Sequence, residues 1–349
     1  LIVPTPETAS TSSNNPSVGI NSPTIINDVV AVLTETNSIA VLPFVNMSSD
    51  AEQEYFADGI SEEILNALVK ATGLRVAGRT SSFSFKGKDD TIKEIGEALN
   101  VAHVLEGSVR KQGNNVRITA QLIKAEDEFH LWSETYDGSL DNIFDLQENI
   151  SRQVTDELKV ILNLNADERL VNKMTDNIDA YDLFLKGREA VGKRLGDNLT
   201  NGITLLQQAV KLDPNFAMAW AVMAEAEAVS PGYLPFNEEE SLAANKRAMK
   251  YAHKAIQLDT QLALPHGVLG LISLDNNDII RSIEELKLAL NLEPKNALAI
   301  RWLGNSYNVL GLNELAMPLY EEAYELDPLS SINTYNLAAN HYKLNNPIE

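Results

Sequence analysis

Three polar residues near the carboxyl end of the chain have types and spacing that could hold an anion. Arg301, Asn305 and Asn308 recur about one helical turn apart, so a helix through them presents a guanidinium and two amides on one face. A guanidinium makes paired, charge-assisted hydrogen bonds to a carboxylate, and amide NH2 groups supply further donors. This face is therefore a candidate for binding a polar partner.

Three further arginines are candidates for contact with an acidic partner. Arg79, Arg110 and Arg117 are cations in a part of the chain that is acidic overall. Two interpretations stay open: the arginines form ordinary surface ion pairs, or they mark a face of a β-sheet that docks an acidic protein.

The remaining polar residues do not form a pattern typical of catalysis or metal binding. The histidines are scattered without a His-Glu-x-x-His pair, and the sequence has no cysteine. Gly87-Lys88 is not a phosphate-binding loop, because Ser82 stands where that loop needs glycine. Glu62 and Glu63 are explained by a predicted helix start, where the dipole favours acidic residues. We expect no catalytic residue, no metal site and no cofactor.

The charge of the chain limits its partners. The 349 residues carry a net charge of −21, whereas nucleic acids and anionic membranes are bound by basic surfaces. We therefore expect no direct nucleic-acid binding. No apolar run approaches the roughly 18 residues of a membrane span. The chain begins at Leu1 rather than Met, and we expect it to be part of a longer protein.

The elements that must position these residues fall into two parts. Residues 1–37 are rich in Ser, Thr, Asn and Pro and are predicted to be a flexible linker. Residues 38–162 mix strand and helix patterns and predict a compact α/β domain, a mixed sheet with packed helices. Residues 163–178 are polar and are predicted to be a second linker.

Local patterns within 38–162 predict individual elements. The run from Ile39 to Val45 is typical of a buried strand, and apolar spacing from Ile60 to Val69 predicts a helix with Ser61 to Glu63 in its first turn. Thr91 to Glu94 is a capping box. Three strands are predicted over 101–137, followed by a long helix over 140–162. The middle strand has one apolar face, made of Val116, Ile118, Ala120 and Leu122.

Residues 179–349 repeat themselves. Four similar stretches begin at Ala209, Ala255, Ala289 and Ala323, and the last three begin 34 residues apart. A fixed period of this length predicts stacked helical hairpins that share a core and leave an open curved face. The first interval is 46 residues, and we assign its excess to a loop over 229–240, because Ser230-Pro231-Gly232 is predicted not to be helical.

The repeats resemble the tetratricopeptide (TPR) family and imply an all-α TPR superhelix. The residues that carry the resemblance occupy that family's packing positions, and they are Leu303, Gly304, Tyr307, Ala316, Tyr320, Ala323 and Pro328. In such arrays the first helix of each pair lines the concave groove. That places Arg301, Asn305 and Asn308 in the groove, with Tyr335 at the matching place in the next unit.

The resemblance implies a protein or peptide ligand for these four residues. Some TPR proteins use an arginine with asparagine amides to bind a peptide carboxylate. Earlier units have Gly267, Leu271 and Leu274 at the same positions, so the set is not shared across the array. The other interpretations are an exposed polar helix face or a contact with a further repeat that this sequence does not include.

Residues 38–162 resemble the TolB-like domain that precedes TPR repeats in bacterial membrane-anchored regulators. The resemblance rests on several short stretches: Ile39 to Phe44, Tyr55 to Gly59, Arg79 to Phe83, Leu105 to Arg110 and Trp132 to Asp137. It implies a non-catalytic, periplasmic sensing and interaction module. The missing amino-terminal output would be a winged-helix DNA-binding domain, which gives a transcriptional regulator, or a class III adenylate cyclase. A free periplasmic scaffold is the third alternative, and the oligomeric state stays open.

Overall fold

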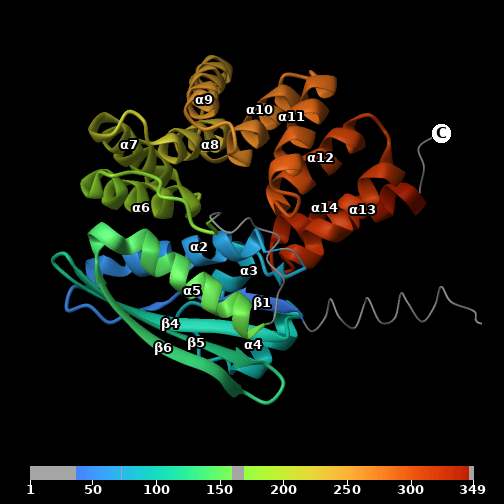
Figure 1. Ribbon diagram of the computed structural model, residues 1–349. Helices are drawn as coiled ribbons and strands as arrows, with labels where there is room; N and C mark the ends of the chain where they lie inside the picture. The colour runs from blue at the N-terminus through green and yellow to red at the C-terminus, as the bar shows by residue number, and fades with distance from the viewer. Residues whose placement is uncertain (1–36, 72, 159–168, 346–349) are drawn as a thin grey trace, which may run out of the picture.

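The computed structural model describes residues 37–71, 73–158 and 169–345 (Figure 1). Residues 1–36 of the predicted first linker lie outside this part, as do residues 163–168 of the second. The described chain forms an α/β layer and a helical array that arches over it (Figure 1).

A mixed sheet forms the base of the molecule. Its strands are ordered β3-β1-β4-β5-β6, with β2 also pairing with β4. Strands β1, β2 and β3 run parallel to their neighbours, and β4, β5 and β6 form an antiparallel meander. The strand bounds are β1 Ser38–Val41, β2 Val45–Asn46, β3 Arg75–Val76, β4 His103–Gln112, β5 Asn115–Lys124 and β6 Phe129–Ser139.

Helices cover both faces of the sheet near β1. Ile39 and Val41 pack into one core with helices α2 (Glu54–Val69) and α5 (Ile143–Glu157), while Ala40 and Leu42 pack on the opposite face with α4 (Ile92–Leu99). A strand covered on both faces is expected to be apolar, and after Ser38 this strand is. The short helix α3 (Arg79–Phe83) follows β3.

Several sequence-based predictions for this region are confirmed. Val116 and Leu122 of β5 are buried and point to the α5 side, while Arg117 between them is exposed. Thr91 and Glu94 form the reciprocal capping box that begins α4. Helix α2, however, begins at Glu54, about two turns before Ser61, so the prediction that Glu62 and Glu63 lie at a helix start was wrong.

The second part is a series of paired helices that resembles a TPR superhelix. The bounds are α6 Ile178–Gly192, α7 Gly196–Leu212, α8 Ala217–Tyr233, α9 Glu238–Leu258, α10 Ala263–Asp275, α11 Ile279–Leu292, α12 Ala297–Val309, α13 Asn313–Leu326 and α14 Ser331–Asn345. The repeated stretches form the ends of α7, α9, α11 and α13. Within the described residues, no helix has both the length and the apolar character needed to cross a bilayer.

The predicted loop at 229–240 is largely helical. Helix α8 continues through Ser230, Pro231 and Gly232 to Tyr233, and α9 begins at Glu238. Proline has a φ that fits a helix and removes one backbone donor, and here the helix ends within the same turn. The Ser230 hydroxyl also donates to the carbonyl of Ala226 at 2.7 Å. The extra residues of the 46-residue interval therefore lengthen the two helices of this hairpin, and no long loop interrupts it.

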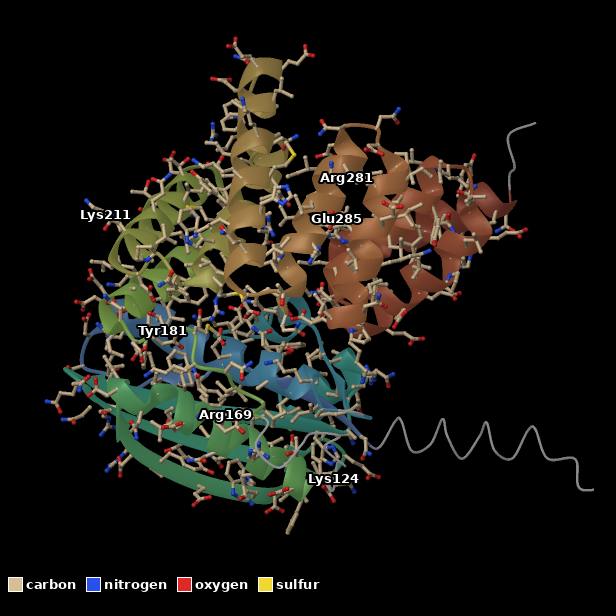
Figure 2. The ribbon with its side chains drawn as sticks, turned by 45° about the horizontal axis from the view of Figure 1, so that its top comes forward. Lys124, Arg169, Tyr181, Lys211, Arg281 and Glu285 are labelled. Atoms are coloured by element: carbon tan, nitrogen blue, oxygen red, sulfur yellow. The ribbon has the colours of Figure 1, made fainter. Side chains whose placement is uncertain are left out.

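The first hairpin shares one core with the α/β domain. Tyr181 and Phe184 of α6 are fully buried, and the Tyr181 ring lies 4.9 Å from that of Phe144 on α5. Tyr181 lies where α6 meets the α/β layer (Figure 2). Since apolar packing runs continuously from sheet to array, this end of the array is fixed to the α/β domain.

Candidate binding sites on the helical array

A buried charge cluster joins α2 to α6. Arg188 of α6 forms ion pairs with Glu63 and, at 3.5 Å, with Glu62, and it donates to the carbonyl of Gly59 at 3.3 Å. The backbones come close here, because a Cβ on Gly59 would lie 2.8 Å from the Leu185 side chain. Glu62 and Glu63 therefore bind arginine across the interface.

The pKa values of Glu62 and Glu63 are shifted in opposite directions. Burial alone would raise the pKa of Glu62, but the charges of Arg188 and Arg79 outweigh it and hold this pKa below its usual value. Burial raises the pKa of Glu63, and Arg188 offsets only part of the effect. The difference arises because Glu62 has a second arginine nearby.

The three arginines predicted to share a sheet face do not all lie on the sheet. Arg79 lies on α3, off the sheet, where its Nε donates to Glu62 at 2.9 Å. Arg110 and Arg117 are direct cross-strand partners on β4 and β5. Arg117 makes a two-pronged pair with Asp137, at 2.6 and 2.9 Å, and Arg110 donates to the carbonyl of Met47. Only Arg110 and Arg117 can share a docking face.

The far end of the array returns to the α/β domain. Asp327, just after α13, accepts hydrogen bonds from the backbone and hydroxyl of Ser81 on α3, and the Gly78 backbone donates to the carbonyl of Leu326 at 2.6 Å. A Cβ on Gly78 would lie 2.7 Å from the Asp327 Cβ, so only glycine allows this approach. Lys295 adds a bond to the carbonyl of Leu74. The curved face predicted to be open is therefore closed at both ends against the chain's own α/β domain (Figure 1).

The predicted clamp residues are not brought together. Asn308 donates to Asn313 of α13 and to Asn340 of α14 and accepts from Lys343 of α14, so these two helices use its amide group. The side-chain Oδ1 of Asn305 accepts from the Tyr320 hydroxyl and from the Asn336 amide. Tyr335 is 67% exposed on α14. Asn305 and Asn308 thus contact α13 and α14 of this chain.

Arg301 differs from its predicted companions. It is half-buried on α12, and within the described part of the chain no residue pairs with or hydrogen-bonds its guanidinium, which lies 5.9 Å from the Trp302 ring. Burial lowers its pKa, and the nearby charge of Arg194 lowers it further. An anion-binding role remains chemically open to Arg301 because all its donors are available.

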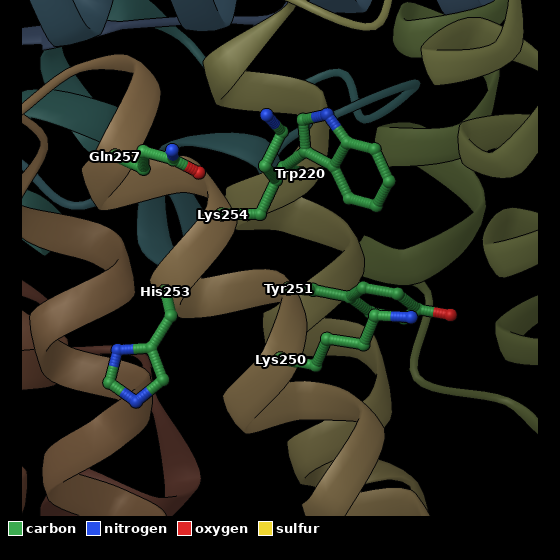
Figure 3. A pocket seen from close by; sticks show the side chains of 6 residues that line it. All are labelled: Trp220, Lys250, Tyr251, His253, Lys254 and Gln257. Atoms are coloured by element: carbon green, nitrogen blue, oxygen red, sulfur yellow. The ribbon is translucent and has the colours of Figure 1, made fainter.

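A surface pocket of about 440 Å³ lies between α8 and α9. Its aromatic floor is Trp220 and Tyr251, whose ring centroids are 5.5 Å apart and tilted by 46° (Figure 3). The Trp220 Nε1 donates to the carbonyl of Pro214 at 3.0 Å, which fixes the indole. The remaining lining residues all come from α9 and are Lys250, His253, Lys254 and Gln257.

Lysines on α9 extend this pocket into a basic stripe. Lys246, Lys250 and Lys254 are spaced by four residues and so follow one face of the helix. No described carboxylate forms an ion pair with any of them, whereas Arg247 is held by Glu227 at 2.7 and 2.8 Å. We name Trp220, Tyr251 and these three lysines the α9 face.

The predictions made from the sequence do not include the α9 face. The signal was available, because residues 246–254 contain four Lys or Arg and no Asp or Glu in a chain of net charge −21. Trp220 could not be joined to this set, since only the packing of α8 on α9 brings it beside Tyr251. In the ranges that the structure describes, no group of three His, Cys, Asp or Glu side chains could hold a metal ion.

Comparison with known proteins gives two kinds of relative. A family model described as the HilA/YgeH-like transcriptional regulator, second domain, matches residues 35–153. A Rhizobium meliloti protein provisionally named adenylate cyclase 3 is 42% identical over 184 residues, 53% of this chain and 31% of that protein. The transcriptional regulator HilA of Salmonella typhimurium is 23% identical over 317 residues, 88% of this chain and 54% of HilA. The chain thus spans only part of each relative.

Solved structures with some likeness are TPR proteins. One, a thermophilic TPR protein of Thermus thermophilus, has 16% identity and a TM-score of 0.41, and the match covers 58% of this chain and 92% of that one. YrrB, described as a TPR protein with an unusual peptide-binding site, has 18% identity and a TM-score of 0.33, covering 48% of this chain and 80% of its own. The chain is similar to HilA/YgeH-like regulators over residues 35–153, and its helices pair as TPR helices do.

Proposed function

We propose that this chain is a non-catalytic protein-interaction and sensing module of a larger regulatory protein. The names of the relatives support a regulator, since one is a transcriptional regulator and another is named as a cyclase. The helical array supports the interaction role, because stacked hairpins present extended surfaces to other proteins. The whole protein would carry its output in a part that this chain does not include.

We consider three identities for the whole protein. The first choice is the periplasmic part of a membrane-anchored transcriptional regulator, with a TolB-like domain before the array. The second is the same module of a class III adenylate cyclase, and the third is a free periplasmic scaffold. The sequence upstream of Leu1 distinguishes them: a winged helix with one apolar span, a cyclase domain, or a cleavable signal peptide.

The observation that carries the interaction role is the α9 face. Two half-buried aromatic rings lie beside lysines that no described carboxylate neutralises, in a strongly acidic chain. Aromatic anchors with a charged rim are typical of protein-binding surfaces. The matching ligand is an acidic peptide segment with an apolar side chain that enters the pocket between Trp220 and Tyr251.

Peptide binding tests this role. Acidic peptides with and without one central leucine would be titrated against the protein, and their fluorescence anisotropy measured at several salt concentrations. We expect the leucine-containing peptide to bind more tightly, with an affinity that falls as salt screens the lysines. Lys250→Glu/Lys254→Glu should abolish binding. Lys93→Glu/Lys287→Glu, the same charge change at exposed lysines of α4 and α11, should not. Equal losses in both double variants would reject the α9 face.

A further inference from the structure

The first turns of α9 carry the kind of segment that the α9 face is expected to bind. Glu238 and Glu239 are exposed, and no cation among the described residues forms an ion pair with either of them. Glu240 differs, because its side chain accepts a hydrogen bond from the Asn237 backbone at 2.8 Å and so caps the helix. Leu242 follows about one turn later and is 64% exposed. Helix α9 thus begins with an acidic segment that has one exposed apolar side chain.

This segment and the lysines of the α9 face lie along one stripe of the same helix. Glu239, Leu242, Lys246 and Lys250 are spaced by three or four residues, and all four are exposed. The stripe is therefore acidic at its amino-terminal end, apolar one turn later and basic over its second half. The basic half borders the aromatic pocket between α8 and α9 (Figure 3).

A stripe of this kind is complementary to itself when two copies meet in antiparallel orientation. A two-fold axis across the middle of α9 places the acidic end of each helix beside the basic end of the other. If Leu242 of one copy lies over the pocket of the second copy at Tyr251, then Glu238 and Glu239, one turn before Leu242, face Lys254 of the second copy. One register therefore satisfies both the apolar contact and the charges.

We propose that two copies of this chain associate through α9, each helix inserting Leu242 into the aromatic pocket of the other. This inference rests on the α9 face of the proposed function and names a second copy as its partner. An acidic peptide would then bind only by separating the two copies. Lys246 lies near the two-fold axis, faces its own counterpart and opposes the pairing. Because one helix forms the contact, we expect a weak dimer, with a Kd on the order of 10 µM.

Sedimentation equilibrium of the intact chain at up to about 100 µM measures this association. Salt of about 0.15 M would screen the repulsion between two chains of net charge −21. We expect a monomer–dimer equilibrium that Leu242→Ala weakens about tenfold or more, because the apolar contact is lost. Ile280→Ala, at an isoleucine of α11 that is 66% exposed, is the matched control and should keep the wild-type Kd. A chain that stays monomeric, or a Leu242→Ala variant with the wild-type Kd, overturns the proposal.

Charge reversal identifies the two surfaces that meet. Glu238→Lys/Glu239→Lys and Lys250→Glu/Lys254→Glu each bring like charges together, so each double variant should be monomeric where the wild type is dimeric. An equimolar mixture of the two should form dimers again, because both ends of the mixed contact then carry opposite charges. If the mixture stays monomeric, the antiparallel contact is wrong.

Lys246 distinguishes this proposal from peptide binding. Lys246→Ala removes a repulsion between copies and should tighten the dimer, but it also removes an attraction for an acidic peptide and should weaken peptide binding, each by about two- to fivefold. A weaker dimer in Lys246→Ala would contradict the register. If an acidic peptide binds a chain that stays monomeric, self-association is wrong and the proposed function stands. If the chain dimerises through α9 and no acidic peptide binds, the reverse holds.

Discussion

Asp327 and Ser81 lie 246 residues apart, and the Asp327 Oδ1 accepts hydrogen bonds from the Ser81 backbone at 2.7 Å and from its hydroxyl at 2.5 Å. At the corresponding position of α9, Asp259 accepts from the backbone of Gln261, two residues away, and from no other residue in the described ranges. The same repeat position thus closes a local turn in one unit and ties the array to the α/β domain in another.

Asp327→Ala should open the far end of the arch. It leaves the buried Ser81 donors unpaired, and a charged hydrogen bond contributes about 1.5–3 kcal/mol. We expect the free energy of unfolding to fall by about that amount and amide hydrogen exchange to accelerate over residues 78–83. Asp259→Ala is the matched control and should cost about 0.5–1.5 kcal/mol without changing exchange at 78–83. Unchanged exchange at 78–83 in Asp327→Ala would refute the tie.

Arg188→Met should strongly destabilise the near end. It leaves Glu63, which is 3% exposed, as a buried carboxylate without its partner, and such a loss costs about 3–5 kcal/mol. The double variant Arg188→Met/Glu63→Leu should recover most of that loss, because apolar residues can replace a buried ion pair. Urea unfolding of the two single variants and the double variant measures the coupling. If the double variant loses as much free energy of unfolding as the two single variants together, Arg188 and Glu63 are not coupled.

Asp182 should make the near end sensitive to acid. Burial would raise its pKa, but hydrogen bonds from Lys186 and Tyr55 and the charge of Lys111 outweigh burial and lower it. A carboxyl whose folded pKa is depressed contributes stability above its unfolded pKa, about 4, and that stability is lost as pH falls through the folded value.

The measurement is the urea midpoint of unfolding at pH 7 and at pH 3. Asp182→Asn should lower the midpoint at pH 7 and narrow the difference between the two pH values. Asp179→Asn, which changes an exposed acid on the same helix, should leave that difference close to wild type. If Asp182→Asn behaves like Asp179→Asn, the ion pairs of Asp182 contribute nothing to acid sensitivity.

Gly304→Ala should loosen the pair α12 and α13. A Cβ at this position would lie 2.8 Å from the Tyr320 ring, which must then shift, and overpacking of this kind costs about 1–3 kcal/mol. Gly232→Ala in α8 meets nothing within 4 Å and should be neutral or stabilising by up to about 1 kcal/mol. Thermal unfolding of both variants tests the contrast, and a neutral Gly304→Ala would refute the close approach.

The sequence predicted the elements whose signals are local. The alternation in β5, the capping box at Thr91 and the 34-residue period each depend on residues within one or two elements of each other. The loop prediction at Pro231 was wrong because it used only the local effect of proline. The hydrogen bond of Ser230 and the packing of α8 keep this segment helical.

The candidate sites were only partly visible in the sequence. Arg301 was singled out as a possible anion ligand, and the structure leaves its guanidinium available on α12. Asn305 and Asn308 were assigned to the same ligand, but α13 and α14 use them instead. The lysine spacing on α9 can be seen in the sequence, whereas the place of Trp220 beside Tyr251 cannot.

The sequence by itself determined that the chain has a mixed α/β part and a paired-helix array, and it determined which side chains each element carries. Only the tertiary structure decided how the array curves, and therefore that Asp327 reaches Ser81. Curvature is the sum of small rotations at every helix contact, and no single local pattern encodes that sum. The partners of the buried charges follow from it.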